Sequence, residues 1–264
     1  MRSGPAGGNG GLPVLSVRNL TIRFNGTPPF TALSRVNLDI WEGEFLLLAG
    51  SNGSGKTLLM RCLAGLLETR EGEILFRGQP LSRTRSLRRE LGLVFQDAET
   101  QLLGETVEED AAFGPENLGF SGEETERRVK AALEAVGLET KRKRPPRRLS
   151  GGEKRRLAVA GILAMGCGII IMDEPFANLD WPGVVQVLEI LVSLKRAGKT
   201  LVVLTHELEK VLALADRLAI LHQGVLRDDG DPAAVLDRMD RAWGVRDPRR
   251  NYRSLADCSW LPGI

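Results

Sequence analysis

A glycine-rich loop between a buried strand and a helix constrains this chain more than any other feature. Residues 44–49 (EFLLLA) form a short, nearly continuous apolar run, typical of a strand covered on both faces. A helical stretch is expected from Lys56 to Leu67. Glycines let backbone N–H groups curl around a phosphate, and a helix N-terminus adds positive potential. The loop between these elements is therefore predicted to bind phosphate.

The loop fits the pattern G-x-x-x-x-G-K-[ST]. Its backbone is expected to cradle the phosphates of a nucleotide through Gly50, Ser51, Asn52, Gly53, Ser54 and Gly55. Lys56 is expected to reach the β- and γ-phosphates, and Thr57 to bind Mg²⁺. A plain glycine-rich turn would need no Lys-Thr pair, which favours the nucleotide site.

Two acids end a second apolar run, residues 169–174 (IIIMDE). The carboxyl end of a strand in a parallel sheet opens onto the ligand crevice. Asp173 is therefore predicted to hold Mg²⁺ beside Thr57, and Glu174 to polarise a water for in-line attack. Taken alone, the pair could equally be acids at the start of a turn.

Residues 149–153 (LSGGE) precede another helix and are called the signature segment below. Ser150 and Glu153 fit a capping box, which explains part of the pattern. It does not explain Gly151 and Gly152, since consecutive glycines cost backbone entropy. Their use is to offer N–H groups to an anion at a helix N-terminus, so a second phosphate-binding helix end is predicted.

The patterns around these motifs indicate an α/β fold. Residues 14–24 alternate as an antiparallel strand does, and further buried strands are predicted at 91–95, 168–172, 200–204 and 218–221. Helices are predicted at 106–118, 123–136 and 150–165. This order predicts a parallel-sheet core with an antiparallel β subdomain and a helical subdomain at about 97–165. The domain is expected to span residues 13–240, between a flexible tail at 1–12 and a C-terminal tail at 241–264.

Charge and composition exclude several classes of protein. Thirty-six basic against thirty-four acidic residues give a net charge of +2, which offers no general attraction for nucleic acid. The run 141–148 (KRKRPPRR) could be a nucleic-acid or nuclear-targeting patch, but a solvated loop between helices fits the balanced charge better. The cysteines Cys62, Cys167 and Cys258 have neither disulfide nor zinc spacing, which favours a reducing compartment.

No membrane span is expected from the apolar runs. The longest uncharged run, 157–172, has sixteen residues and is broken by Gly166 and Gly168. A spanning helix needs about 20 apolar residues, so this run predicts a buried helix followed by a buried strand. The glycine-rich residues 1–11 do not fit a signal peptide. The sequence still allows the chain to dock on a membrane surface.

In combination, these motifs resemble those of ATP-binding cassette ATPases, the nucleotide-binding subunits of ABC transporters. The resemblance covers residues from about 14 to 240. It implies a P-loop NTPase fold with ATP and Mg²⁺ as cofactors. In that family the LSGGE segment of one subunit closes over ATP held by another, which implies a head-to-tail dimer. Ser150, Gly151 and Gly152 would then bind the partner's nucleotide, in a homodimer or a heterodimer with a paralogue.

Further positions match the family in order along the chain. Phe24 lies where an aromatic residue stacks on adenine, with Phe30 as a rival. Gln96 matches the glutamine that senses Mg²⁺ and the membrane partner, and Asp180 matches the loop that crosses the dimer interface. His206 matches the histidine that contacts the γ-phosphate. The resemblance thus implies catalytic roles for four residues, listed in chain order: Lys56, Gln96, Glu174 and His206.

A narrower similarity, to the ATPases of energy-coupling-factor importers for vitamins or cobalt and nickel ions, lies in residues 94–102 and 106–118. It implies integral membrane partners and a peripheral position on the cytoplasmic face of the cell membrane. Asp97-Ala98 departs from the usual Asn-Pro after the glutamine. Four apolar residues are expected to line a groove for a partner helix or to form an ordinary buried face: Leu102, Leu103, Val107 and Phe113.

Two other classes compete with the importer. A soluble ABC-type ATPase with a non-transport role usually carries a coiled-coil insertion, a zinc module or a second cassette, and none of these patterns is found in the sequence. A P-loop kinase would share Lys56 and Thr57 but would have no use for the paired glycines of the signature segment.

Overall fold

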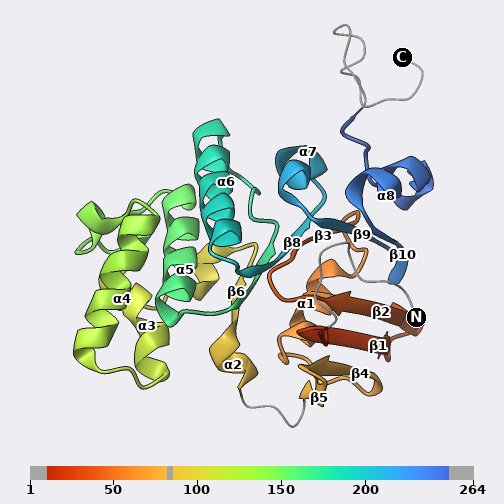
Figure 1. The fold of residues 1–264 in the computed structure, drawn as a ribbon, viewed down its shortest axis with the longest axis horizontal. Helices are drawn as coiled ribbons and strands as arrows, with labels where there is room; N and C mark the ends of the chain where they lie inside the picture. The colour runs from red at the N-terminus through yellow and green to blue at the C-terminus, as the bar shows by residue number, and fades with distance from the viewer. Residues whose placement is uncertain (1–10, 82–85, 250–264) are drawn as a thin grey trace, which may run out of the picture.

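A computed structural model describes residues 11–81 and 86–249 of the chain. Its strands form two sheets (Figure 1). The four-stranded sheet has the order β2-β1-β4-β5, with β1 at Leu15–Phe24, β2 at Phe30–Ile40, β4 at Glu71–Phe76 and β5 at Gln79–Pro80. The six-stranded sheet has the order β10-β9-β3-β8-β7-β6, with β3 at Phe45–Ala49, β6 at Leu91–Val94, β7 at Ile169–Asp173, β8 at Thr200–Thr205, β9 at Arg217–His222 and β10 at Val225–Gly230.

The pairing of the strands confirms the predicted fold class. Strands β9, β3, β8, β7 and β6 run parallel, and β10 is antiparallel to β9. The four-stranded sheet is antiparallel throughout. Every residue of β3 and β7 is buried, as expected for strands covered on both faces. Neighbouring strands β3, β8 and β7 end at Ala49, Thr205 and Asp173, so the loops that follow them meet at one edge of the sheet.

Helices cover this framework. The α-helices are α1 at Lys56–Leu63, α2 at Leu87–Glu90, α3 at Val107–Asn117, α4 at Gly122–Ala135, α5 at Gly151–Met165, α6 at Trp181–Arg196, α7 at Leu208–Val211 and α8 at Pro232–Arg238. Short 3₁₀ helices are η2 at Ala98–Gln101, η3 at Glu139–Lys141, η4 at Pro146–Arg148, η5 at Leu212–Leu214 and η6 at Arg241–Trp243. Figure 1 shows α3, α4 and α5 grouped at the end of the molecule away from the four-stranded sheet. The sixteen-residue uncharged run is a buried helix followed by a buried strand, as predicted.

Helix α1 ends earlier than the sequence analysis predicted. It stops at Leu63 rather than Leu67 because Gly65 adopts the left-handed conformation, with φ of 67°. The Gly65 amide donates to the Cys62 carbonyl and the Leu66 amide donates to the Arg61 carbonyl. These two bonds form a Schellman motif, which ends a helix by satisfying its last carbonyls.

The basic run 141–148 forms part of the helical group, and its first three cations are paired. Arg142 lies 2.6 Å from Glu108, 2.7 Å from Glu126 and 3.2 Å from Glu139. Lys141 pairs with Glu153, and Lys143 pairs with Glu108. The side chain of Pro146 is buried. This arrangement fits a structural loop that joins helices.

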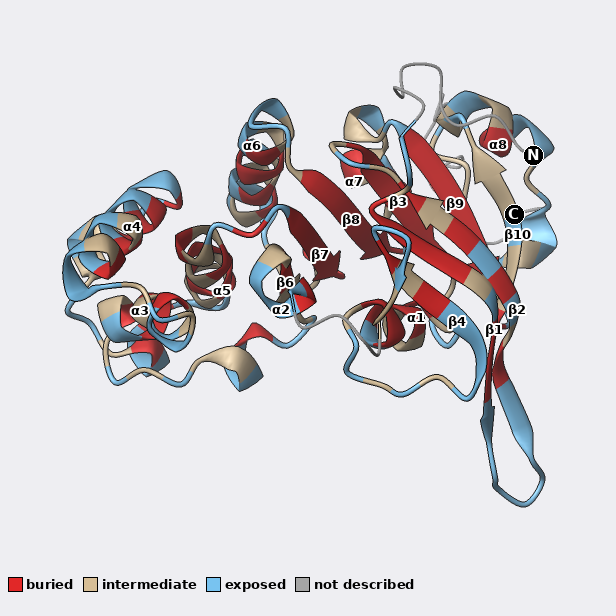
Figure 2. Ribbon diagram, turned by 60° about the horizontal axis from the view of Figure 1, so that its bottom comes forward, coloured by how far each residue is buried: buried red, intermediate tan, exposed pale blue. Residues whose placement is uncertain are grey.

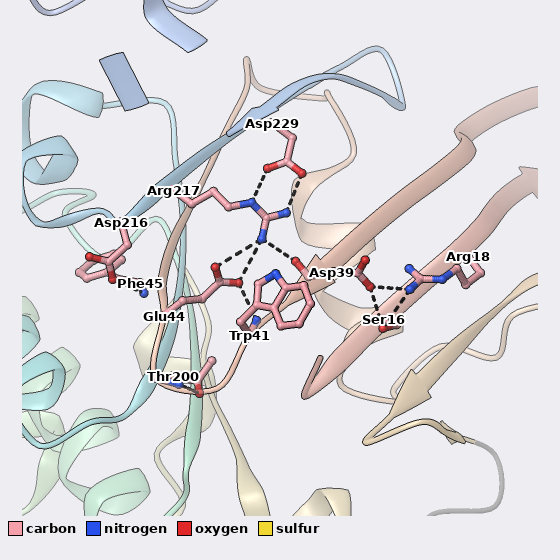
Figure 3. Close-up of polar contacts among 11 residues, drawn as sticks. Ser16, Arg18, Asp39, Trp41, Glu44, Phe45, Thr200, Asp216, Arg217 and Asp229 are labelled. Carbon is pink, nitrogen blue, oxygen red and sulfur yellow. Dashed lines mark hydrogen bonds and ion pairs between the residues drawn. The ribbon is translucent and has the colours of Figure 1, made fainter. Parts of the chain in front are cut away.

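A buried arginine connects the two sheets (Figure 3). Arg217, at the start of β9, makes a bidentate pair with Asp229, with both N–O distances at 2.6 Å. Its Nη1 donates to the Asp39 carbonyl at 2.8 Å and to both oxygens of Glu44 at a longer 3.3 Å. Asp39 belongs to β2 and Asp229 to β10, so one guanidinium links both sheets.

The predicted tails fall largely outside the described residues, since residues 1–10 and 250–264 are not described. Cys258 lies there as well. Within the described ranges, no helix is long and apolar enough to cross a bilayer.

Candidate active site

The phosphate loop needs its glycines for backbone reasons. A Cβ on Gly50 would lie 2.2 Å from the Leu221 carbonyl oxygen, and one on Gly55 would lie 2.7 Å from the Leu33 side chain. Gly55 also has φ of 104° immediately before α1. Gly53 has φ of 77°, while Ser51 and Asn52 lie toward the surface. The Ser54 amide donates to the Ser51 carbonyl at 3.1 Å. A glycine-rich loop at the N-terminus of α1 is suited to bind an anion through its other amides.

Lys56 is buried against this loop. Its Nζ donates to the Gly50 carbonyl at 2.7 Å and to the Ser51 carbonyl at 3.3 Å, and lies 3.5 Å from Glu174 Oε1. Only 6% of each side chain in the Lys56–Glu174 pair is exposed. Burial lowers the pKa of Lys56, while the carboxylates of Glu174 and Asp173 oppose that shift. The Lys56 ammonium is therefore held in a buried site by two backbone carbonyls. The phosphates of a nucleotide would replace these two partners.

Thr57 and Asp173 meet beside the loop. Thr57 Oγ1 donates to Asp173 Oδ2 at 2.6 Å. The other oxygen, Asp173 Oδ1, is buried and has no hydrogen-bond partner among the described residues. Burial raises the pKa of Asp173, and the Thr57 hydroxyl opposes the rise. A buried carboxylate oxygen without a partner, next to a hydroxyl, is chemistry that suits Mg²⁺, which prefers oxygen ligands.

Glu174 is held at the convergence of β7 and β8. Its Oε2 accepts from Thr205 Oγ1 at 2.9 Å, and its Oε1 lies 2.9 Å from His206 Nδ1. Its backbone has φ of 47°, a left-handed conformation that non-glycine residues adopt at an energetic cost. Such strain is concentrated at functional positions. The contacts bring together Lys56, Glu174 and His206, which the sequence analysis assigned to one reaction.

Gln96 and Asp180 lie at other edges of this region. Gln96 follows β6, the strand beside β7, and its side chain is exposed. Asp180 caps α6 by accepting from the Gly183 amide at 3.0 Å. Their predicted roles toward nucleotide, metal and partner stay predictions.

Phe24 and Phe30 are cross-strand partners on β1 and β2. Both are exposed, Phe24 by 49% and Phe30 by 61%. Figure 2 shows that the hairpin formed by these strands extends beyond the body of the molecule with an exposed tip. Either ring is placed to stack on a flat ligand, and the choice of Phe24 stays a prediction.

The signature segment forms the predicted capping box. Ser150 Oγ accepts from the Glu153 amide at 3.3 Å, and Glu153 accepts from the Ser150 amide at 2.9 Å. A Cβ on Gly151 would meet open space, so packing within this chain does not require glycine there. Among the described residues, no hydrogen bond joins the segment to the phosphate loop. The action of Ser150, Gly151 and Gly152 on the nucleotide of a second subunit stays a prediction.

A groove lies next to the helix that follows the Gln96 segment. It has a volume of about 350 Å³, and its lining includes side chains of α2, α3, α5 and β6 and four glycines. Leu102, Leu103 and Phe113 line it as expected, and the last two are 66% and 50% exposed. Val107 does not line it, because its side chain is fully buried in the core; it belongs to the ordinary buried face that the sequence analysis gave as the alternative.

Two residues of this region were missed from the sequence. Thr205 holds Glu174 and directly precedes His206, so its place after an apolar strand was a usable signal. Arg155 is buried and donates to the carbonyls of Gln96, Pro175 and Ala177. It lies on the buried stripe of α5 with Ala158, Val159 and Ile162, and this i, i+3, i+4, i+7 spacing predicts burial.

The geometry can be compared with known families. The sequence model of the family described as ABC transporter matches residues 33–177, more than half of the chain. The chain is 38% identical over 243 residues to an energy-coupling factor transporter ATP-binding protein of Methanocaldococcus jannaschii, covering 89% of this chain and 86% of that protein. It is 43% identical over 241 residues to a cobalt import ATP-binding protein of Rhodobacter capsulatus, covering 89% and 85%.

Solved structures agree with the sequence comparisons. CbiO1 from Clostridium perfringens, part of the ABC transporter complex cbiONQ, superposes with a TM-score of 0.76 at 33% identity, covering 85% of this chain and 91% of that one. The dimeric ATP-binding cassette MJ0796, in a post-hydrolysis state bound to ADP and Pi, gives a TM-score of 0.74 at 29% identity, covering 83% and 98%. A protein with this fold is therefore known as a dimer with bound nucleotide.

Proposed function

Because this chain belongs to the ABC transporter family, we propose that it hydrolyses Mg-ATP to energise an importer of the energy-coupling-factor type. It is an ATPase, as its relatives are. The proposed cargo is a vitamin or a cobalt or nickel ion, bound by another polypeptide. The chain would lie on the cytoplasmic face of the cell membrane and pair with a second ATPase subunit, either its own copy or a paralogue.

The proposed reaction uses the residues around Glu174. When the terminal phosphates of ATP enter the loop, Lys56 would leave the Gly50 and Ser51 carbonyls and neutralise phosphate charge. This movement would also release Glu174 Oε1 from the ammonium, so that the carboxylate, still in contact with His206 Nδ1, could orient the attacking water. Thr205 would keep the carboxylate in place, and His206 would brace the γ-phosphate.

The residues present fit the Mg²⁺ ion that this family uses with ATP. Thr57 and Asp173 would hold it, with Gln96 as a further ligand and phosphate oxygens completing its shell. When bound, the ion neutralises charge that develops on the phosphates. No group of three or more His, Cys, Asp or Glu suited to a metal occurs in the described ranges, consistent with an ion that arrives with its nucleotide.

The apolar groove is the single observation that carries the importer proposal. Leu103 and Phe113 leave large apolar surfaces in water, although the domain core is otherwise well covered. Gly161 lines the same groove, and a Cβ there would meet open space, so a helix could approach the floor of the groove closely at this point. We propose that an apolar helix of a membrane subunit occupies it, since an isolated soluble ATPase gains nothing from this exposure.

A two-step experiment tests the proposal. A tagged Glu174→Gln chain is purified with Mg-ATP from gently solubilised native membranes, and the accompanying proteins are identified by mass spectrometry. The wild-type complex is then placed in liposomes and tested for ATP-dependent uptake of cobalt, nickel and vitamins. Membrane subunits that support uptake are the expected result. Soluble partners, or none, would favour a non-transport ATPase.

Variants of the groove provide the control. Leu103→Asp and Phe113→Asp should abolish association with the membrane subunits while Mg-ATP affinity stays unchanged. Leu12→Asp makes the same chemical change at an exposed leucine that does not line the groove, and it should leave association intact. Equal association by all three variants would contradict the assignment of the groove.

A further inference from the structure

Arg155 is an unusual buried cation. Its side chain lies on α5, within five residues of the signature segment, and the residue is only 6% exposed. Buried arginines are normally paired with carboxylates. Arg155 makes no ion pair within 4 Å in the described part of the chain; its bonds go to backbone carbonyls.

These carbonyls belong to two segments of the candidate active site. Nη2 donates to Gln96 at 2.6 Å, in the segment 95–97. Nη1 donates to Pro175 at 2.9 Å and to Ala177 at 2.8 Å, in the turn 175–179 that directly follows Glu174. No other donor to these three oxygens is found among the described residues. Losing the guanidinium would therefore leave both segments without this attachment to α5.

The hydrogen bonds to these carbonyls leave the Arg155 guanidinium only partly satisfied. Its Nε is buried without a hydrogen-bond partner. Burial lowers the pKa of Arg155, and the charges of Asp97 and Glu174 oppose that shift. Both acids belong to or adjoin the two segments, so a shift of either segment changes the field at Arg155 as well as its hydrogen bonds.

We propose that Arg155 is a positioning residue that couples nucleotide occupancy of the chain's own phosphate loop to its own signature segment. Gln96 and Glu174 border the nucleotide site of this chain, whereas Ser150 to Gly152 would act on the nucleotide of the partner subunit. Arg155 lies on the helix that begins with the signature segment, and its hydrogen bonds reach the segments that contain Gln96 and follow Glu174. The inference rests on the proposed head-to-tail use of the signature segment but not on the importer.

Hydrogen–deuterium exchange of the full chain tests this coupling directly. The Glu174→Gln background holds Mg-ATP unhydrolysed, and a protein concentration at which light scattering reports a single copy removes partner contacts. With Arg155 present, Mg-ATP should slow exchange in residues 149–156 as well as in 95–97 and 175–179. In Arg155→Met the slowing at 149–156 should vanish, while Mg-ATP affinity stays within about threefold.

Kinetics of the chain with Glu174 intact give a second readout. Arg155→Met should lower kcat about tenfold or more, as expected for lost charge-assisted hydrogen bonds, with KM within about threefold. A merely structural role would lower thermal stability and affinity together. Arg127→Met is the matched control: Arg127 is 70% exposed on α4, and its loss should change neither readout.

If Arg155→Met folds poorly, Arg155→Gln provides the deciding test, because the glutamine amide is neutral and cannot donate to all three carbonyls. Coupling lost in Arg155→Gln with affinity retained would support the proposal. Coupling retained in either variant would overturn it, as would a Glu174→Gln chain that shows no response at 149–156. The test uses only this chain and Mg-ATP, so its failure is distinct from an absence of membrane subunits in the importer experiment.

Discussion

Replacing Glu44 with glutamine should change the pH dependence of stability. Glu44 is buried at the start of β3, where it accepts from the Trp41 amide at 2.7 Å (Figure 3). Arg217 faces it at 3.3 Å but gives its closer bonds, at 2.6 Å, to Asp229. Burial raises the pKa of Glu44 from 4.5 to about 7, because Arg217 offsets only part of the lost hydration.

The sign of the effect follows from this shift. Since the folded state binds the proton more tightly than the unfolded state, protonation of Glu44 stabilises the fold below its ordinary pKa of 4.5. That contribution is lost as the pH rises through about 7. At about 1.4 kcal/mol per pKa unit, the full contribution is about 3 kcal/mol. Glu44→Gln mimics the protonated form and does not titrate.

Urea unfolding of both proteins between pH 5 and pH 8 measures this difference. Relative to Glu44→Gln, the wild-type chain should lose about 2–3 kcal/mol of unfolding free energy across that range, at an unchanged m-value. Glu42→Gln neutralises an exposed glutamate two residues away and should show no such trend. A constant difference between wild type and Glu44→Gln would refute the reasoning, since it would mean that Arg217 keeps Glu44 ionised throughout.

Three further predictions concern the active site. Glu174→Gln should bind ATP but hydrolyse it about 10²–10³ times more slowly, measured as phosphate release in a functional complex. Phe24→Ala should weaken ATP binding about tenfold, as expected for loss of one stacked base, while Phe30→Ala should not; the reverse order in a titration would assign the adenine contact to Phe30. Thr57→Val should raise the Mg²⁺ concentration needed for half-maximal hydrolysis about tenfold, and an unchanged Mg²⁺ dependence would remove Thr57 from the metal site.

The sequence predicted the parallel half of the fold more closely than the antiparallel half. Strands β3, β7 and β8 are buried on both faces, so their apolar runs are nearly continuous and their limits agree with prediction to within a residue. Strand β1 shifts register several times against β2 and β4, and β2, β4 and β5 were not predicted. Half-covered, irregular strands carry weaker patterns, because turns and bulges break their alternation.

The residues of the candidate site likewise differ in how well the sequence predicted them. Lys56 and Thr57 were predicted because they complete a glycine-rich loop pattern after an apolar strand. Asp173 and Glu174 were predicted because they end another apolar strand. Arg155 was missed because its partners are backbone carbonyls, and carbonyl acceptors leave no mark in a sequence. The end of α1 near Gly65 could have been predicted, since a glycine after a helical run indicates a helix end. The predicted helix was nevertheless extended past it, to Leu67.

Arg155 and Arg217 are both buried arginines, but their hydrogen-bond partners give them different roles. Arg217 has a bidentate carboxylate partner in Asp229, and this pair joins β9 to β10, which are already fixed by sheet hydrogen bonds. Replacing it would cost stability, because the buried Glu44 and the half-buried Asp229 would be left without their cation. Arg155 has no such carboxylate, and its bonds hold loops that follow Gln96 and Glu174 rather than strands. A cation anchored to peptide carbonyls moves with those loops, so its loss should appear in the coupling between segments more than in the stability of the fold.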